Sequence, residues 1–248
     1  MKRKKNIISQ IILTTLSVLI ITSCKKPGTD KQQCRIINMV ITQNSTSTIY
    51  DISYNNDGKP SKITAPSATK TITYGANSIA TLTTDGSGAF LGKVLVTMNN
   101  NNNIANIKEN YNSSGTNWDN IQIIYDGNGI PVKEFKTTSG SNAVTTINYT
   151  VTNGDIVKTS DGVNIDNYGF YADIPYQQGD FLYINSLLSY GVEGYMKNTH
   201  LVKSLSSSGA SANINMTYDM DEKGKIVKLS LTNGLSAPLL ITYQYECN

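Results

Sequence analysis

The chain has few of the residues on which enzyme active sites usually depend. Its 248 residues include one histidine, His200, and no Gly-x-Ser-x-Gly motif, so a Ser-His-Asp triad lacks a recognisable nucleophile. A single histidine without a second nitrogen ligand also disfavours zinc. The sequence contains neither a phosphate-binding loop nor a dinucleotide fingerprint. We therefore predict no enzyme, no catalytic residue, no cofactor and no metal, and a structural role for His200.

Acidic residues do not add a catalytic pattern. Several belong to expected hairpin turns, where turn formation explains them: Asp57, Asp126, Asp219, Asp221 and Glu222. Residues 219–222 lack the downstream bidentate glutamate of a helix-loop-helix calcium site. An enzyme acting on glycans would need two carboxylates that converge in the folded chain, and the sequence points to no particular pair.

Long apolar segments are missing too, apart from one at the start of the chain. Four basic residues, 2–5, precede an apolar-rich stretch over residues 7–21, which is too short to span a bilayer. The stretch ends in Ile-Thr-Ser-Cys, which resembles the lipobox that a lipoprotein signal peptidase cleaves before an acylated cysteine. We predict a signal peptide over residues 1–23 and a palmitate-type lipid anchor on Cys24. The alternative is an ordinary secretory signal with an incidental cysteine.

The net charge argues against nucleic acid as a partner. The formal charge is +3, but residues 2–5 supply four positive charges, so the remaining chain carries about one net negative charge. Residues 24–33 contain several basic side chains and a Pro-Gly pair. We predict a solvated linker there, with a basic tether on anionic head groups as the alternative. Residues 34–248 suffice for one domain with a substantial core.

Two cysteines flank the predicted domain, with Cys34 at its start and Cys247 next to its end. An oxidising envelope compartment permits a disulfide between them. The bond would close a loop of more than 200 residues and restrict the unfolded chain by roughly 5 kcal/mol. We predict this disulfide. Two free thiols in a redox or metal site are the alternative, which the lack of a Cys-x-x-Cys motif disfavours.

A short phrase recurs through the domain: Ile-x-Tyr, a polar turn with Gly or Asn, and a strand that often carries Lys. The copies end at Tyr54, Tyr74, Met98, Tyr125, Tyr149, Tyr218 and Tyr243. Residues two apart in a strand point to the same face, so Ile and Tyr share one face while Ser, Thr or Asn occupies the other. The turn residues make each phrase a β-hairpin.

Repeated hairpins predict an all-β fold. A lone hairpin is marginal in water, so the units must pair side by side and protect their edges. We predict an antiparallel up-and-down meander of about 13–16 strands. The meander forms either a curled sheet, a half-barrel or a barrel. No convincing amphipathic helix of ten residues is visible, apart from a short turn near residues 184–189.

One insertion interrupts the meander at about residues 166–200. Eight of the chain's 20 aromatic residues lie within 28 residues there. Long loops of this kind are commonly functional, and tyrosine rings can stack on a sugar or an apolar ligand. Packing of the meander's open end is the alternative, and Trp118 is either a core anchor or a ligand platform. The candidate ligand-binding residues are Tyr168, Tyr171, Tyr176, Phe181, Tyr183, Tyr190, Tyr195 and Trp118.

The hairpin phrases of the form Tyr-x-x-x-Gly-x-Pro-x-Lys, the lipobox and the Cys34/Cys247 pair together resemble a family of Bacteroidetes-type envelope lipoproteins of unknown function. The resemblance covers nearly the whole chain after Cys24. It implies a porin-like or curled β-meander fold with a distant likeness to tyrosine-aspartate (YD) repeats, and it carries over no catalytic residue. Residues 25–27 lack the acidic pair of surface-export signals, so the periplasmic face and the cell surface both remain open.

These observations lead to three functional hypotheses. The first is a non-enzymatic, lipid-anchored outer-membrane protein that binds a glycan or an apolar small ligand. The second is a structural or assembly partner of an envelope membrane protein. The third is an enzyme acting on glycans. Because Ser, Thr and Asn dominate one strand face, we do not expect a membrane-spanning pore, which would need an apolar outward face.

Overall fold

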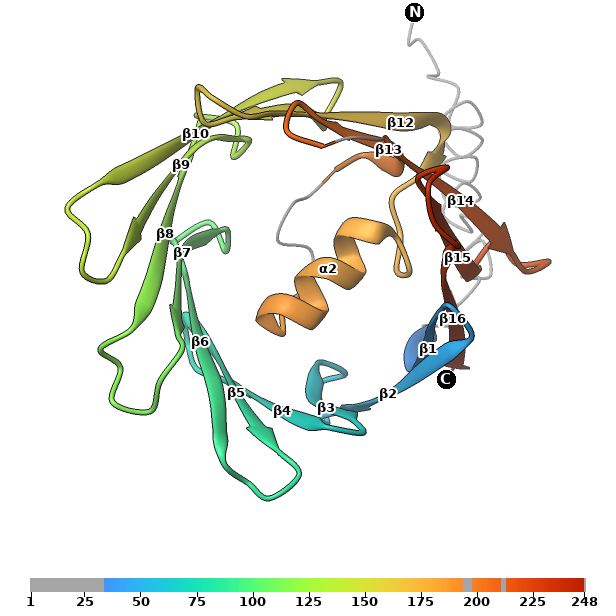
Figure 1. Ribbon diagram of the computed structural model, residues 1–248, viewed down its shortest axis with the longest axis horizontal. Helices are drawn as coiled ribbons and strands as arrows, with labels where there is room; N and C mark the ends of the chain where they lie inside the picture. Colours follow the sequence, from blue (N-terminus) through green and yellow to red (C-terminus); the bar gives the residue numbers. More distant parts are fainter. Residues whose placement is uncertain (1–33, 194–197, 211–212, 248) are drawn as a thin grey trace, which may run out of the picture. The chain divides into compact units, whose positions relative to one another are not determined.

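The computed structural model describes residues 34–193, 198–210 and 213–247, in which sixteen antiparallel strands close into a barrel (Figure 1). Each strand pairs with its neighbours in sequence, and β1 lies beside β16. The predicted meander is confirmed, with the strand number at the upper end of the expected range. The strands are β1 (Cys34–Gln43), β2 (Thr46–Tyr54), β3 (Pro60–Ala65), β4 (Ala68–Tyr74), β5 (Ser78–Asp85), β6 (Phe90–Met98), β7 (Ile104–Asn110), β8 (Trp118–Tyr125), β9 (Pro131–Thr138), β10 (Val144–Thr152), β11 (Asp155–Ser160), β12 (Ile165–Pro175), β13 (His200–Ser207), β14 (Ile214–Met220), β15 (Ile226–Thr232) and β16 (Leu239–Cys247).

One type of turn recurs at the hairpins that follow the Ile-x-Tyr phrases. In the β8–β9 turn, Asp126 Oδ1 accepts hydrogen bonds from the backbone N–H groups of Asn128 and Ile130, both at 2.9 Å. Gly129 adopts a left-handed conformation with φ of 78°. Asn55, Asn99 and Asp221 accept the equivalent pairs of bonds in their own turns. In these four hairpins the Asn or Asp side chain therefore fixes the turn that sets the strand register.

The two faces of each strand differ sharply in character. Along β4, Ile72 is 4% exposed and faces the interior, while Thr71 and Thr73 point outward. Thr71 lies beside Lys62 of β3. Alternation of this kind continues around the barrel, so the Ile/Tyr face lines the inside and the Ser/Thr/Asn/Lys face forms the outside. The prediction that the apolar face is buried is confirmed.

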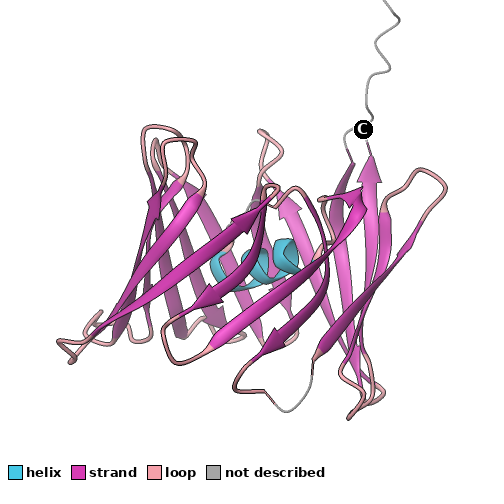
Figure 2. Cartoon of the chain, turned by 90° about the horizontal axis from the view of Figure 1, so that it is seen from above, coloured by secondary structure: helices cyan, strands magenta, loops and turns pink. Residues whose placement is uncertain are grey.

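The helix α2 (Phe181–Tyr190) lies inside the barrel (Figures 1 and 2). The sequence predicts only a short turn there, near residues 184–189, within an insertion over about 166–200. Residues 165–175 instead extend the meander as β12, and β13 begins at His200, so the departure from the meander is limited to residues 176–199. Because the barrel encloses the helix on several sides, apolar residues are spread around it, which weakens the amphipathic pattern that identifies a surface helix.

Asp180 fixes the N-terminus of this helix. Its carboxylate is completely buried; Oδ1 accepts a hydrogen bond from the Leu182 backbone N–H at 2.8 Å. Oδ2 accepts from the Val202 backbone N–H on β13 and the Tyr218 hydroxyl on β14, both at 3.0 Å. One side chain thus caps the helix and attaches it to two strands. Burial raises the pKa of the Asp180 carboxyl, while these hydrogen bonds act in the opposite direction.

The C-terminus of α2 is held by the opposite wall. Lys70 Nζ on β4 donates to the Ser189 carbonyl at 3.1 Å, and Thr81 Oγ1 on β5 donates to the Tyr190 carbonyl at 2.8 Å. A cation near the last carbonyls of a helix also interacts favourably with the helix dipole. Gly191 ends the helix with φ of 73°, and a Cβ there would lie 2.4 Å from Thr81 Oγ1. The helix is therefore fixed to the wall at both ends.

The predicted disulfide between Cys34 and Cys247 is present. The predicted signal peptide over residues 1–23, the lipidated Cys24 and the linker over residues 24–33 lie outside the described residues. Within the part of the chain that the structure describes, no helix is both long and apolar enough to cross a membrane.

Candidate functional site

At one end of the barrel, five tyrosines make the same hydrogen bond. Each stands at the end of an even-numbered strand, and its hydroxyl donates to a carbonyl near the start of the preceding strand at 2.7–2.8 Å. We call this set the tyrosine ring. Its donors and acceptors are Tyr54 to Ile36, Tyr74 to Pro60, Tyr125 to Ile104, Tyr218 to Val202 and Tyr245 to Ile226. The ring accounts for four copies of the phrase, those ending at Tyr54, Tyr74, Tyr125 and Tyr218, since each of these tyrosines joins its own pair of strands.

The tyrosine ring is interrupted on β6, on β10 and on β12, which ends at Pro175. Met98 ends β6, and near the end of β10 the inward residue is Val151, which a bulge separates from Thr150. Tyr149 lies two positions farther from this end of the barrel, and its hydroxyl donates to Glu134 instead of to a backbone carbonyl. Met98 and Val151 both line a cavity of about 600 Å³. We call this space the mouth cavity.

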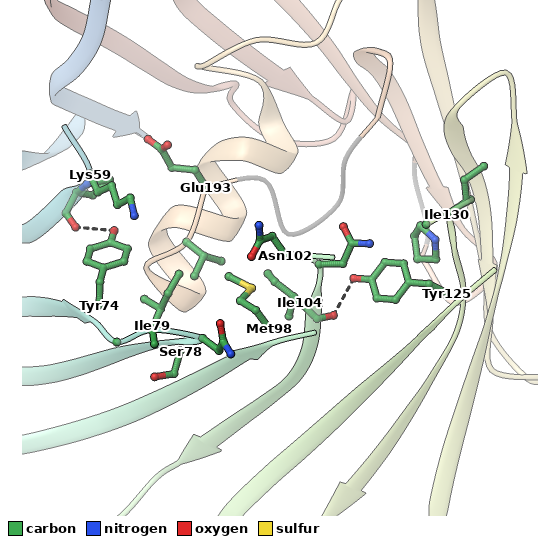
Figure 3. Close-up of a pocket in the computed structure, with 18 of the residues that line it drawn as sticks. Lys59, Tyr74, Ser78, Ile79, Met98, Asn102, Ile104, Tyr125, Ile130 and Glu193 are labelled. Atoms are coloured by element: carbon green, nitrogen blue, oxygen red, sulfur yellow. Dashed lines mark hydrogen bonds between the residues drawn. The ribbon is translucent and has the colours of Figure 1, made fainter. Parts of the chain in front are cut away.

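Apolar side chains form the inner walls of the mouth cavity. Figure 3 shows Tyr74 and Tyr125 on opposite sides, with Ile79, Met98 and Ile104 between them. Val192, which follows α2 and is 2% exposed, closes the inner side together with Ile156. These residues come from six strands and from the segment after the helix, so only the closed barrel brings them together.

Polar groups gather at the rim. They belong to the hairpin turns and to the segment after α2: Lys59, Asn77, Asn102, Asn103 and Glu193. The Tyr183 hydroxyl on α2 donates to Glu193 Oε1 at 2.6 Å, which ties this carboxylate to the helix. The cavity therefore has an apolar interior and a rim that carries amides and one charge of each sign.

The cavity tyrosines are protonated hydrogen-bond donors. Burial raises the pKa of Tyr125 to about 12, and burial together with the negative charge of Glu193 raises the pKa of Tyr74 to about 12. Both hydroxyls already donate to backbone carbonyls. Among the described residues no cluster of His, Cys, Asp and Glu suits a metal ion. The arrangement is therefore suited to holding a ligand by contact.

His200 takes part in a separate network next to the mouth cavity. Its Nδ1 lies 2.7 Å from Asp155 Oδ2, and Asp155 Oδ1 accepts from the backbone N–H groups of Thr199 and His200. These bonds hold the residues with which the chain enters β13. Neither His200 nor Asp155 is among the residues that line the mouth cavity.

The predicted aromatic residues separate into distinct environments. Tyr171, Tyr176 and Tyr183 pack into the core around α2, and the Tyr171 hydroxyl donates to the Met216 carbonyl at 2.9 Å. Trp118 is the first residue of β8 and lies on the outward face, with Lys108 Nζ 5.1 Å from its ring centroid.

Three other candidates meet in one place, and one is not described. Tyr168, Phe181 and Tyr190 line a second cavity of about 310 Å³. Tyr195 lies outside the described residues. None of the described candidate residues lines the mouth cavity. That cavity was missed because its residues are spread over hairpin ends; the visible signal was Met98, which takes the Tyr position in one copy of the phrase.

Comparison with known proteins supports the fold. No protein-family model and no curated protein matches the chain. A crystal structure of a porin-like protein from Bacteroides uniformis is similar, with 12% sequence identity, a TM-score of 0.60 and coverage of 85% of this chain and 98% of that chain. A porin-like protein from Bacteroides vulgatus has the same identity and coverage with a TM-score of 0.46. At this identity the first likeness shows a shared barrel fold, and the resemblance to a lipoprotein family with YD-like repeats stays a prediction.

Proposed function

We propose that this protein is a non-enzymatic binding protein of the outer membrane whose mouth cavity holds an apolar small ligand. The observation that carries this proposal is the interruption of the tyrosine ring. Where the ring position holds a Tyr, its hydroxyl joins neighbouring strands; a cavity of about 600 Å³ opens where Met98 and Val151 take that position on β6 and β10. Cavities of roughly 300–1,000 Å³ with apolar walls and few polar groups are typical ligand sites.

The cavity chemistry favours an apolar ligand over a glycan. A glycan needs many hydrogen-bonding partners, yet the interior walls are formed by Ile, Met, Val and the rings of two tyrosines. The hydroxyls of Tyr74 and Tyr125 already donate to Pro60 and Ile104 carbonyls. An apolar body seated between the rings, with a polar end at the amides of the rim, would satisfy both parts of the site.

The two faces of the barrel support a location beside the bilayer rather than across it. A membrane-spanning barrel presents an apolar band outward, with polar residues inside. Here most outward residues of neighbouring strands are polar, as in the pairs Thr71 with Lys62 and Ser230 with Thr217, and single apolar residues such as Ile49 are interspersed among them. The isoleucines and tyrosines face inward. We infer a barrel that is held at the outer membrane by a lipid on Cys24, with its wall in water.

Binding of an uncharged fluorescent apolar probe, N-phenyl-1-naphthylamine, tests this function. We expect saturable fluorescence enhancement with the purified protein, and displacement by long-chain alcohols but not by oligosaccharides. Ile79→Trp should fill the mouth cavity and abolish the enhancement, because Ile79 lies between the two tyrosine rings.

The matched control makes the same substitution on the outer wall. Ile49 is 49% exposed on β2, so Ile49→Trp should leave probe binding unchanged. Equal binding by the wild type and Ile79→Trp, with both proteins folded by circular dichroism, would contradict the proposal. Displacement by oligosaccharides alone would assign the cavity to a glycan.

A further inference from the structure

The outer surface of the barrel over β3–β11 carries lysines but no outward carboxylate. These strands lie side by side in one stretch of the wall (Figure 1). Among the described residues, no ion pair joins its outward lysines to a carboxylate. We call this stretch the basic wall. Its lysines, placed outward by the alternation along each strand, are Lys62, Lys93, Lys108, Lys133 and Lys158.

The carboxylates of these strands point inward or bind backbone groups at strand ends. Glu109 lies opposite Asp119 on the inner face, where Asp119 is 8% exposed. Glu134 is 6% exposed and also faces inward. Asp85 accepts hydrogen bonds from its own hairpin turn, and Asp155 accepts from the N–H groups that lead into β13. The strands therefore keep their negative charge inside and their unpaired positive charge outside.

Two central lysines have exposed aliphatic neighbours on the adjacent strand. Lys93 of β6 lies opposite Leu82 of β5, which is 42% exposed. Lys133 of β9 lies opposite Ile124 of β8, which is 37% exposed. Water alone gives no reason to place an apolar side chain beside each ammonium group. A surface with anionic groups above carbon would contact both.

Aromatic rings accompany the central lysines as well. Lys108 Nζ lies 5.1 Å from the ring centroid of Trp118, and Lys133 Nζ lies 5.8 Å from that of Phe135. Tryptophan is enriched at membrane–water interfaces, and lysine side chains there can lay their carbon stems along apolar surface while the charge stays in water. The basic wall thus combines the residue types of a membrane interface.

The other side of the barrel provides an internal comparison. There Lys228 of β15 forms an ion pair with Asp219 of β14 at 2.8 Å. Arg35 of β1 forms an ion pair with Glu246 of β16 at 2.6 Å. Charges that neutralise one another in this way offer little attraction to an anionic surface. Only one side of the wall therefore has the charge that such a surface would bind.

The composition of the basic wall favours a bilayer surface over the alternatives. An acidic polysaccharide would bind the lysines but gain little from Leu82 and Ile124. Insertion across the membrane would need a continuous apolar band. Polar residues interrupt the outward face instead, as Asn120 and Gln122 do on β8 between Trp118 and Ile124. The pattern fits contact with head groups, without entry into the hydrocarbon.

We propose that the basic wall rests on the anionic head groups of a lipid bilayer. The lysines contact the phosphates, and Leu82, Trp118 and Ile124 lie within the hydrated head-group layer. This contact goes beyond the proposed function, since it depends neither on a ligand in the mouth cavity nor on a lipid on Cys24.

Fluorescence of Trp118 tests this contact, because it is the only tryptophan of the chain. The full-length protein is added to vesicles of brominated phosphatidylcholine, with or without anionic phosphatidylglycerol. We expect bromine quenching to be at least about twofold stronger with the anionic lipid, and high salt should remove the difference. Equal quenching by the two vesicles would overturn the proposal. So would a change in emission with polygalacturonate, an acidic polysaccharide, and none with the anionic vesicles.

Lysine substitutions separate the basic wall from the total charge. Lys93→Gln/Lys133→Gln should lose the extra quenching that the anionic lipid produces. The matched control, Lys203→Gln/Lys228→Gln, removes the same charge from β13 and β15 and should keep that quenching. Each pair combines one exposed and one half-buried lysine. Equal loss in the two double variants would show that net charge, and not the basic wall, drives the contact.

Moving the tryptophan tests which side of the barrel meets the lipid. Trp118→Phe/Thr242→Trp places the only tryptophan on the outward face of β16, where Thr242 is exposed opposite Lys228. We expect no extra quenching by the anionic vesicles in this variant. Quenching as strong as that of Trp118 would refute a contact specific to the basic wall. Circular dichroism checks that every variant is folded.

Discussion

Strands β1–β4 and β12–β16 pack tightly against α2, whereas β5–β11 surround open space. In the packed half, one apolar cluster joins the helix to the wall and includes Leu187, Leu201, Ile226 and Leu229, all fully buried. In the hollow half, a smaller cluster on β6–β8 includes Val192 and is contacted by Tyr190 at the end of α2. The two cavities border this half. The same hairpin repeat thus supports stability on one side and leaves room for ligands on the other.

The largest loss of stability in the packed half is expected when a buried side chain of α2 is removed. Leu187 is 0% exposed and lies within the larger cluster. We expect Leu187→Ala to lower the free energy of unfolding by about 4 kcal/mol, because the enclosed site cannot collapse around the missing atoms. Urea denaturation measures this. Leu82 is 42% exposed on β5, and Leu82→Ala should cost less than about 0.5 kcal/mol. Similar losses in the two variants would show that the helix does not stabilise the barrel.

The attachment of α2 to β13 and β14 through Asp180 should contribute nearly as much to stability. Asp180→Ala removes the helix cap and the acceptor for Val202 N–H and the Tyr218 hydroxyl. We expect a loss of about 3 kcal/mol in the free energy of unfolding, since buried donors lose their partners. Hydrogen exchange of the α2 amides should accelerate in the same variant. Unchanged hydrogen exchange would show that contacts other than those of Asp180 hold α2 in place.

The buried carboxyl also predicts a pH effect. Because burial raises the pKa of Asp180 above its value in the unfolded chain, the folded state holds the proton more tightly. Its contribution to stability is complete below the ordinary carboxyl pKa and is lost as pH rises through the folded-state pKa, with a slope of at most about 1.4 kcal/mol per pH unit. Unfolding of the wild type and Asp180→Asn across acidic pH measures it. The stability advantage of the wild type should fall as pH rises; a rising advantage would contradict the direction of the shift.

Two ring tyrosines compare the halves directly. The Tyr218 hydroxyl contacts both the Val202 carbonyl and Asp180, whereas the Tyr125 hydroxyl contacts the Ile104 carbonyl beside the mouth cavity. We expect Tyr218→Phe to lower the free energy of unfolding by about 2 kcal/mol and Tyr125→Phe by about 1 kcal/mol. Thermal and urea unfolding measure both. The reverse order would show that the hollow half carries more of the stability.

The smallest expected change in stability comes from completing the tyrosine ring. Met98 takes a Tyr position of the repeat at the edge of the mouth cavity. Met98→Tyr should change the free energy of unfolding by less than about 1 kcal/mol while abolishing binding of the apolar probe, because the new ring occupies the cavity. Retained probe binding would mean that the interruption does not create the ligand site.

Much of the fold was predictable because it rests on local rules. Ile-x-Tyr places two side chains on one strand face, and Asp126 or Asn55 with a following Gly fixes the turn. The helix α2 was not predicted, since a helix surrounded by a barrel wall needs no polar face. The position of Asp180 as its cap is visible only when β13 and β14 are placed beside it.

The candidate site was only partly predictable, for a different reason. The aromatic segment does contribute to a cavity through Tyr168, Phe181 and Tyr190, yet its neighbours Tyr171 and Tyr183 are core residues. Spacing cannot separate these roles, because they depend on which wall the helix faces. The mouth cavity collects turns that are up to about a hundred residues apart, which no local pattern can report.

The tyrosine ring also bears on how the barrel forms. Each of its bonds joins strands of one hairpin, and every other pairing, except the one between β1 and β16, joins consecutive strands. Assembly can therefore proceed by adding one hairpin after another, at low loop-closure cost, until the first and last strands meet. Because β1 and β16 are neighbours, a circular permutant could link these two strands covalently and place its new termini in an exposed turn of the hollow half. Every strand of this permutant would keep its present neighbours in the barrel.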